Sequence, residues 1–439
     1  MEQDFKPHLT KGVRHRRENF GGLVKPPVEL AIETDQICFR VNKIGIEIIE
    51  LCTGEISLSD IVQEIKRRHK NINDETIIAF VNQIGEIGLF DSCNRRIILS
   101  TKKFSNNTDD KPIVFPKLKF PSIVFWELTD LCNLRCKHCY TGSGLTKNAL
   151  SAEQIFAIEK QLLDNGIFYL GLGGGEPLLV CCLDEIIERA TKEGVSVSLS
   201  TNGILVTKRR AAKLSRTGLS VIQVSIDGPE TIHDFIRGKG VYEKAIRAIT
   251  ILKNQGMNVR CAMTVNNLNF DKIEETFLAV YDLGIDWFIA FRCMQEGRAN
   301  SLSKLTSDQL RIATETLVLL EKKYPKMISY EKLVFFPFLI DQSIKAIRGC
   351  EAGRSICNIT FDGKITPCPH SRLPVLGNLT NNNIRSIWEK TNPFSMDIVQ
   401  ECLVCKFSLS CNGGCKGISM SKFGDDVHAD QTCWNLKSL

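Results

Sequence analysis

The chain has 439 residues, of which 43% are hydrophobic and 24% are charged, and its formal net charge is +6. This length predicts two or three domains, and the mild positive charge favours an ordinary solvated surface over nucleic-acid binding. The first 20 residues lack the apolar segment of a secretory signal. The longest apolar run, residues 333–340, is too short to cross a membrane. We therefore expect a soluble, cytoplasmic protein without nucleic-acid or membrane partners.

The 18 cysteines of the chain are concentrated in two places. Three lie at positions 132–139, and eight lie between positions 350 and 433. A reducing compartment does not maintain structural disulfides. The clustering therefore favours metal or iron–sulfur ligands.

Residues 1–95 show short extended pieces, including residues 21–24, 31–34 and 38–41, followed by three helical patterns. Ser57 and Asp60 predict a capped start for the middle helix. The last helix carries an apolar face at helical spacing, formed by Ile77, Phe80, Val81 and Ile84. Residues 96–118 contain a polar stretch that predicts a linker.

Residues 119–335 alternate β-rich runs with helical segments. The six runs are residues 122–129, 168–174, 195–202, 219–227, 258–265 and 286–292. This alternation predicts a parallel α/β structure, because parallel strands need helical crossovers. The distinctive polar clusters follow the runs at their carboxyl ends, where such folds build their sites. Residues 301–347 predict a helical connection.

The first polar cluster contains three closely spaced thiols, Cys132, Cys136 and Cys139. Three thiolates can hold three irons of a cubane cluster and leave the fourth iron open. A small molecule can occupy an open metal position, as in catalytic zinc sites. The alternative from spacing alone is a zinc site completed by His138 or by a distant residue.

The pattern Cys132-x3-Cys136-x2-Cys139 resembles the cluster loop of radical S-adenosylmethionine (SAM) enzymes. The resemblance implies a partial (β/α)6 TIM-like barrel in which SAM chelates the open iron. It also implies reductive cleavage of SAM to methionine and a 5′-deoxyadenosyl radical, which abstracts a substrate hydrogen. The position before the third cysteine is usually aromatic, and here it is the planar His138, with Tyr140 adjacent as a candidate cofactor contact.

Other motifs of this region resemble the family's SAM-binding segments. Gly174, Gly175 and Glu176 resemble its GGE motif, whose carboxylate can accept hydrogen bonds from an ammonium group. Ser200 and Asn202 resemble the segment that meets the ribose, although a polar turn is an equal alternative. The candidates for holding the SAM carboxylate are Ser225 and Arg237, with Asp227 as a loop support instead. Arg292 and Arg298 resemble the end of the family's sixth strand without an assigned contact.

Residues 345–439 are rich in cysteine, glycine and turn residues and predict a segment that folds around metal rather than an apolar core. Their cysteine spacing resembles the SPASM extension, which implies two auxiliary [4Fe–4S] clusters and three clusters in all. The implied ligands are Cys402, Cys405, Cys411 and Cys433 for the distal cluster, and Cys350, Cys368 and Cys415 for the nearer one. We predict that Cys357 completes the nearer cluster, which otherwise has an open iron. A pair of zinc sites is the alternative.

Residues 16–65 resemble the peptide-binding domain of the pyrroloquinoline quinone pathway, the RiPP precursor recognition element (RRE), a winged-helix α+β fold. The resemblance implies that a leader peptide adds a strand near residues 37–41 and packs on a helix near residues 75–87. A winged-helix packing or dimerisation module is the alternative. DNA binding is disfavoured because Asp74 and Glu86 on that helix would repel phosphate.

Together these resemblances imply a radical SAM/SPASM peptide maturase, similar to those of the pyrroloquinoline quinone and mycofactocin pathways. Its partners would be a precursor peptide, bound through its leader, and an electron donor such as a flavodoxin or ferredoxin. The alternatives are a radical SAM enzyme that acts on a protein or small molecule, and a non-catalytic iron–sulfur carrier. Sulfatase maturases usually have an aspartate base directly after the cysteine equivalent to Cys368. This chain has Pro369 and then His370, which is therefore the candidate catalytic base.

Overall fold

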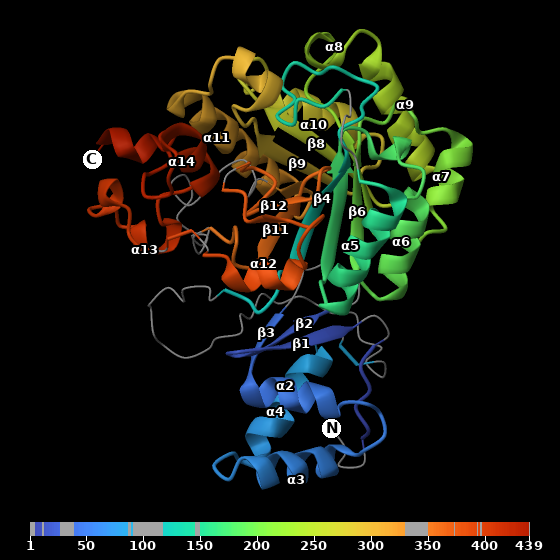
Figure 1. The fold of residues 1–439 in the computed structure, drawn as a ribbon, viewed down its shortest axis with the longest axis vertical. Helices are drawn as coiled ribbons and strands as arrows, with labels where there is room; N and C mark the ends of the chain where they lie inside the picture. Colours follow the sequence, from blue (N-terminus) through green and yellow to red (C-terminus); the bar gives the residue numbers. More distant parts are fainter. Residues whose placement is uncertain are drawn as a thin grey trace. The chain divides into compact units, whose positions relative to one another are not determined.

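The computed structural model describes most of the chain, and the segment 31–34 and most of the linker lie outside the part that it describes. The described residues are 5–10, 13–26, 39–86, 89–90, 117–144, 150–329, 350–372, 374–392, 394–395 and 397–438. The chain divides into two compact units, residues 1–111 and 112–439 (Figure 1). Within the described segments, every helix is too short or too polar to cross a bilayer.

The first unit contains a three-stranded antiparallel sheet and three helices. Its elements are β1 (Arg14–Glu18), β2 (Gly21–Lys25), β3 (Phe39–Asn42), α2 (Lys43–Leu51), α3 (Leu58–Arg68) and α4 (Asp74–Glu86). The strand order is β1-β2-β3, so β3 is an edge strand of this sheet. The sequence missed β1, whose alternating basic residues gave no apolar signal.

Local chemistry explains where the helices of this unit begin. The side chain of Asn42 accepts a hydrogen bond from the backbone N–H of Gly45 at 2.7 Å and caps α2. Ser57 and Asp60 form a reciprocal capping box on α3, which confirms the predicted start of that helix. In α4, the predicted apolar face is confirmed, because Ile77 and Val81 are fully buried.

The second unit contains the six predicted strands, all parallel and consecutive in the sheet. They are β4 (Ile123–Thr129), β5 (Tyr169–Gly174), β6 (Ser196–Thr201), β7 (Val221–Ser225), β8 (Val259–Val265) and β9 (Trp287–Arg292). The helices are α5 (Ala152–Asp164), α6 (Leu183–Lys192), α7 (Lys208–Leu214), α8 (Glu230–Arg237), α9 (Val241–Lys253), α10 (Ile273–Tyr281) and α11 (Ser307–Lys323). Helices α5, α6 and α7 cover one side of the sheet in Figure 1. The predicted parallel α/β arrangement is thus confirmed.

The two faces of this sheet differ in polarity because side chains alternate along each strand. Residues such as Trp126, Leu170 and Val197 enter the main apolar core. Each such side chain contributes roughly 1.5–3 kcal/mol by its burial. The opposite face, called the inner face here, carries polar side chains: the Tyr169 hydroxyl donates to Ser198 Oγ at 2.6 Å. The sheet can therefore surround a polar ligand while remaining anchored by its outer face.

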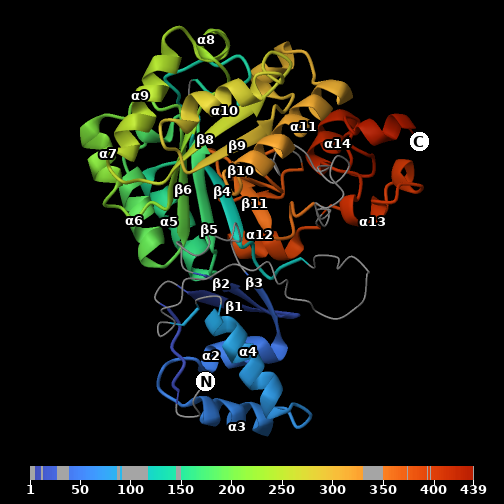
Figure 2. The same cartoon turned by 180° about the vertical axis from the view of Figure 1, so that it is seen from behind.

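The carboxy-terminal region extends this same sheet. Strand β10 (Ile328–Ser329) pairs with β9, and β11 (Ile356–Ile359) pairs in parallel with β4. Strands β12 (Lys364–Thr366) and β13 (Gly377–Asn378) follow in antiparallel order, and Figure 2 shows β11 beside β4 from behind. The remaining helices are α12 (Ile384–Lys390), α13 (Ser408–Cys411) and α14 (Lys416–Phe423).

This arrangement corrects the expectation that the carboxy-terminal region lacks an apolar core. Ile359, Ile365 and Trp388 belong to the main hydrophobic core of the second unit. The sequence concealed this because β11 has only four residues and gains its stability from a distant strand rather than from local periodicity.

Candidate functional site

The three-thiol loop follows directly after the carboxyl end of β4. Cys132, Cys136 and Cys139 are free cysteines. Burial raises the pKa of Cys132 and that of Cys136, and a negative charge on Cys139 adds to both rises. Burial is the larger cause and raises the pKa of Cys136 to about 11. Iron would supply the positive charge that such buried thiols need for deprotonation. The donor set therefore fits a cluster with three cysteine ligands.

Glycines allow neighbouring loops to pack tightly on the cluster loop. A Cβ on Gly174 would lie 2.3 Å from the carbonyl oxygen of Thr129, and one on Gly175 would lie 2.1 Å from that of Leu131. Gly174 also has a φ of +118°, which favours glycine. The GGE glycines thus bring the end of β5 against the cluster loop itself, a contact that the sequence did not indicate.

Glu176 binds protein groups rather than facing an open site. Its fully buried carboxylate accepts hydrogen bonds from the Thr201 hydroxyl at 2.7 Å, from the Asn202 N–H at 2.9 Å and from the Leu178 N–H at 3.1 Å. Burial raises the pKa of Glu176, and these donors oppose that rise. The carboxylate therefore joins β5 to β6, and its predicted contact with the SAM ammonium group stays a prediction.

The other predicted SAM contacts take several positions around the cluster loop. Asn202 donates from Nδ2 to Asn133 Oδ1 at 2.7 Å and approaches Cys132 Sγ at 4.0 Å. Ser200 Oγ accepts a hydrogen bond from the Gln223 amide at 3.2 Å. Ser225 is half-buried at the last position of β7. Asn202 thus holds the cluster loop, and Ser200 and Ser225 end neighbouring strands.

A buried charge network anchors the cluster loop to β7. Asp227 is fully buried and lies 2.8 Å from His138 Nε2 and 2.5 Å from Arg237 Nε. Arg237 Nη1 also approaches Cys136 Sγ at 4.0 Å. Burial would raise the pKa of Asp227, but Arg237 and His138 outweigh burial and hold the pKa well below its usual range. His138 therefore packs against Asp227 at the position before the third cysteine, and Asp227 supports the loop.

Arg298, to which the sequence assigned no contact, fastens the cluster loop from the side of β9. Its guanidinium donates to the carbonyl oxygens of Cys136 at 2.9 Å and Ser143 at 2.8 Å. Its backbone N–H donates to the Cys139 carbonyl at 3.0 Å. The planar guanidinium has several N–H donors and can bind two carbonyl oxygens at once, which the single ammonium group of a lysine could not reproduce in this geometry.

A second ion pair lies between the cluster loop and the carboxy-terminal cysteines. Arg372 Nη1 donates to the buried Glu127 at 2.9 Å, and its guanidinium lies 5.3 Å from the centre of the Tyr140 ring. Burial raises the pKa of the Tyr140 hydroxyl, with smaller contributions from Cys139 and Cys368. Tyr140 therefore lies between a proposed ligand of the SAM cluster and a proposed ligand of the nearer auxiliary cluster.

The carboxy-terminal thiols form two groups. In one, burial raises the pKa of Cys411 and that of Cys402, and neighbouring thiols add to the rise: Cys433 and Cys402 for Cys411, and Cys405 for Cys402. These four match the proposed distal ligands. In the other group, burial raises the pKa of Cys350 to about 11, and the charge of Cys415 contributes to this rise.

His370 and Cys368 belong to the turn that packs against this second group. A Cβ on Gly417 would lie 2.9 Å from the His370 carbonyl oxygen, so residues 415–417 contact this turn. The His370 ring centre lies 6.0 Å from that of Phe291 in an edge-to-face arrangement. Within the described segments, no three His, Cys, Asp or Glu side chains already surround a single metal ion.

Two buried cations accompany the second group of thiols. Burial would lower the pKa of Arg292, but Asp430, at 2.7 Å, and Cys415 outweigh burial and raise it. Lys416 is 1% exposed and donates from Nζ to the Asp426 carbonyl at 2.7 Å. Sequence reasoning missed both contacts, because each partner lies far along the chain or in a loop.

Cys357 lies in β11 with its side chain in the main apolar core. Its register partner is Val124 of the same core. Burial raises its pKa, and no charged group contributes in the part of the chain that the structure describes. This placement favours a core residue over the predicted cluster ligand.

We expect Cys357→Ala to retain the iron content of the wild type. The loss of one buried sulfur should lower the free energy of unfolding by about 1 kcal/mol. Cys350→Ala serves as the matched comparison, because it removes a thiol that lies near Cys415. Iron analysis after anaerobic reconstitution should show a loss in the Cys350 variant alone. An equal loss in the Cys357 variant would restore Cys357 as a ligand.

Comparison with known proteins identifies the class of this fold and site. Residues 126–280 match the radical SAM superfamily, and residues 350–415 match the SPASM iron–sulfur cluster-binding domain. The chain belongs to the radical SAM superfamily and carries an SPASM domain. These two domains imply iron–sulfur clusters and SAM as cofactors.

The relatives of the chain include enzymes named as mycofactocin maturases and as heme synthases. The mycofactocin maturase MftC of Mycolicibacterium smegmatis is 30% identical over 312 residues, which cover 68% of this chain and 79% of MftC. An AdoMet-dependent heme synthase of Methanosarcina barkeri is 27% identical over 341 residues, which cover 71% of this chain and 96% of that enzyme. The structure of Streptococcus suis SuiB bound to precursor peptide SuiA shares the fold, with a TM-score of 0.72 and 16% identity over 98% of this chain and 100% of SuiB.

Proposed function

We propose that the protein is a peptide maturase that uses the SAM-derived 5′-deoxyadenosyl radical to modify a ribosomally made precursor peptide. The observation that carries the proposal is the combination of the anchored three-thiol loop with a first unit that has an edge strand beside a pocket. The 30% identity to mycofactocin maturase MftC and the fold shared with SuiB support it.

The proposed cofactors are three [4Fe–4S] clusters and SAM. Cys132, Cys136 and Cys139 would hold the cluster that binds SAM and supplies the electron for its cleavage. The carboxy-terminal groups would hold the auxiliary clusters through Cys350, Cys368 and Cys415 and through Cys402, Cys405, Cys411 and Cys433. Two inner groups near the cysteine loops, Glu127 and His370, are the candidates for accepting a substrate proton.

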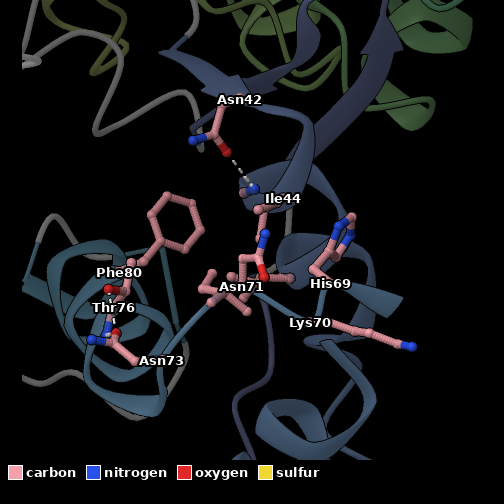
Figure 3. A pocket seen from close by; sticks show the side chains of 11 residues that line it. Asn42, Ile44, His69, Lys70, Asn71, Asn73, Thr76 and Phe80 are labelled. Atoms are coloured by element: carbon pink, nitrogen blue, oxygen red, sulfur yellow. Dashed lines mark hydrogen bonds between the residues drawn. The ribbon is translucent and has the colours of Figure 1, made fainter. Parts of the chain in front are cut away.

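The first unit is the proposed binding site for the leader. Strand β3 offers an unpaired edge in the described sheet, and strand addition would satisfy its backbone groups. A neighbouring pocket of about 580 Å³ lies between α2 and α4, with Ile44, Ile48 and Phe80 among its walls. Figure 3 shows Phe80 and Ile44 facing this pocket, whereas Lys70 extends away from it. The pocket suits an apolar side chain of a bound peptide.

We expect Ile44→Glu to lower peptide modification at least about ten-fold, because it replaces an apolar part of the pocket wall with a charge. Release of 5′-deoxyadenosine without peptide should stay at the wild-type rate, because the substitution lies in the other unit. The substrates tested should be the short peptides encoded next to the gene, with their mass changes followed by mass spectrometry. Gln63→Glu, which adds the same charge on the exposed face of α3, is the matched control. Equal modification by both variants would contradict leader binding at the pocket.

The heme synthase relatives favour a second candidate, the modification of a tetrapyrrole. Three of these relatives are matched over 86–96% of their own length at 26–28% identity. Incubation of the reconstituted protein with Fe-coproporphyrin III, SAM and reductant separates the two candidates. Conversion of the porphyrin, with every tested peptide unchanged, would favour the tetrapyrrole candidate.

A further inference from the structure

The outer surface of the cluster loop is basic. Arg135 and Lys137 alternate with buried residues: both are exposed, whereas Cys136 and His138 are buried. The side chains of Cys136 and His138 are therefore enclosed by protein, whereas those of Arg135 and Lys137 are in solvent. Two exposed cations are common on a solvated surface, so a binding role needs support from the neighbouring residues.

Helix α8 completes this surface with an exposed aromatic ring. The Phe235 side chain is 54% exposed, and Lys137 Nζ lies 3.2 Å from its ring centre. The Lys137 backbone N–H donates to the Ile236 carbonyl at 2.9 Å, so the loop and the helix are joined. A cation held over an aromatic ring is a preorganised contact rather than a freely moving side chain.

These residues surround a shallow hollow of about 360 Å³ that reaches a proposed cluster ligand. Cys132 lines the hollow together with Arg135, Lys137, Phe235 and Gly238. Exposed Lys239 follows Gly238 directly. We call Arg135, Lys137, Phe235 and Lys239 the basic patch.

No acidic side chain lines the hollow in the described part of the chain. Two carboxylates close to this segment in the sequence, Asp234 and Asp227, have other partners. Asp234 accepts hydrogen bonds from the backbone N–H groups of Gly240 and Tyr242, and Asp227 is buried against Arg237. Among the described residues, the cations that line the hollow thus have no acidic side chain beside them in its wall.

We propose that the basic patch docks an acidic one-electron carrier protein that reduces the cluster held by the loop's three cysteines. The proposal rests on the proposed function, because reductive cleavage of SAM consumes one electron. The carrier is oxidised by one electron, the electron breaks the sulfur–C5′ bond of SAM, and methionine and the 5′-deoxyadenosyl radical are the products. A carrier seated on the patch would contact the segment that contains Cys132.

The chemistry of the patch fits this kind of partner. Complementary charge steers diffusional encounter and raises the association rate, and it does so less at high ionic strength. An exposed aromatic residue near the centre of a patch is a typical binding hot spot. The basic patch supplies both features next to the site where the electron is needed.

The test compares a protein reductant with a small one. The Arg135→Glu/Lys137→Glu variant and the wild type are reconstituted, and 5′-deoxyadenosine release is followed with reduced flavodoxin or with dithionite. With flavodoxin we expect the variant to be at least about ten-fold slower, because charge reversal repels an acidic carrier. With dithionite, which needs no docking surface, the two rates should agree within about two-fold. Raising the salt from about 50 mM to about 300 mM should slow only the flavodoxin reaction of the wild type.

Two further variants test whether the position and the sign of the charges matter. Lys208→Glu/Arg209→Glu makes the same charge change at exposed positions of the α7 segment and should leave both reactions unchanged. Arg135→Gln/Lys137→Gln removes charge without adding repulsion and should give an intermediate flavodoxin rate. Both should contain as much iron as the wild type.

Three results would overturn the proposal. The first is an unchanged flavodoxin rate in the charge-reversed variant. The second is an equal loss with both reductants or a loss of iron, which would make the patch a support of the cluster. The third is RNA oligonucleotide binding that the variant loses while its flavodoxin rate is unchanged. Absence of dithionite-driven cleavage in the wild type would instead reject the proposed function.

Discussion

Asp227→Asn should destabilise the second unit by about 3–5 kcal/mol, because it leaves Arg237, whose side chain is only 10% exposed, without its charged partner. The side chain keeps its shape, so the loss can be assigned to charge. It would also weaken the contacts to His138 and to the Thr264 N–H, which donates to Asp227 at 2.8 Å. We expect iron content to fall and SAM cleavage to drop about 100-fold, since the cluster loop would lose its anchor to β7. Chemical denaturation, iron analysis and 5′-deoxyadenosine release measure these effects.

Asp286→Asn is the matched control for that variant. Asp286 accepts hydrogen bonds from Lys253 Nζ at 2.6 Å and from the Val259 N–H at 2.7 Å, at the opposite ends of the strands. This pair is more exposed, so its loss should cost about 1 kcal/mol and leave SAM cleavage unchanged. Wild-type cleavage by Asp227→Asn would contradict the anchoring role of Asp227.

Arg372→Met should be the second large effect, a loss of about 3 kcal/mol near pH 7. The substitution leaves the Glu127 carboxylate buried without its partner. In the wild type, burial already raises the pKa of Glu127, and Arg372 opposes that rise. Without Arg372, the pKa of Glu127 should rise further, and the folded state should bind a proton more readily than the unfolded state.

The sign of the resulting pH dependence follows from that pKa. A carboxylate whose folded pKa is raised destabilises the protein above that pKa, and protonation relieves the cost as the pH falls. The deficit of Arg372→Met should therefore shrink from pH 7 to pH 5. The Glu127→Gln/Arg372→Met double variant should regain most of the stability at pH 7, because no buried charge remains. A deficit that is constant with pH in the single variant would show that lost packing, not charge, is the cause.

The sequence predicted those parts of the molecule that local patterns encode. β-rich runs separated by helical segments marked all six strands of the second unit, and the spacing of Ser57 and Asp60 marked the start of α3. The polar motifs were placed at the carboxyl ends of the strands because parallel strands bring those ends together. These signals each lie within a few residues of chain.

Contacts between distant segments were not predictable in this way. The pairing of Arg292 with Asp430 and of Glu127 with Arg372 joins the strands to the carboxy-terminal region, and no local pattern indicates either partner. The hydrogen bonds of Glu176 to Thr201 and Asn202 were not predictable either, because a carboxylate in a loop can bind a ligand or its neighbours. Cys357 was grouped with the ligands by its spacing along the chain, and its position in β11 places it in the apolar core.

The central claim is that the thiols of Cys132, Cys136 and Cys139 hold a cluster that cleaves SAM. The most direct test reconstitutes the wild type and a triple Cys→Ala variant at these positions anaerobically, counts iron, and follows 5′-deoxyadenosine release from SAM with dithionite. We predict about twelve irons in the wild type, about eight in the variant, and nucleoside from the wild type alone. Equal iron in both proteins without release from either, or zinc in place of iron, would contradict the account.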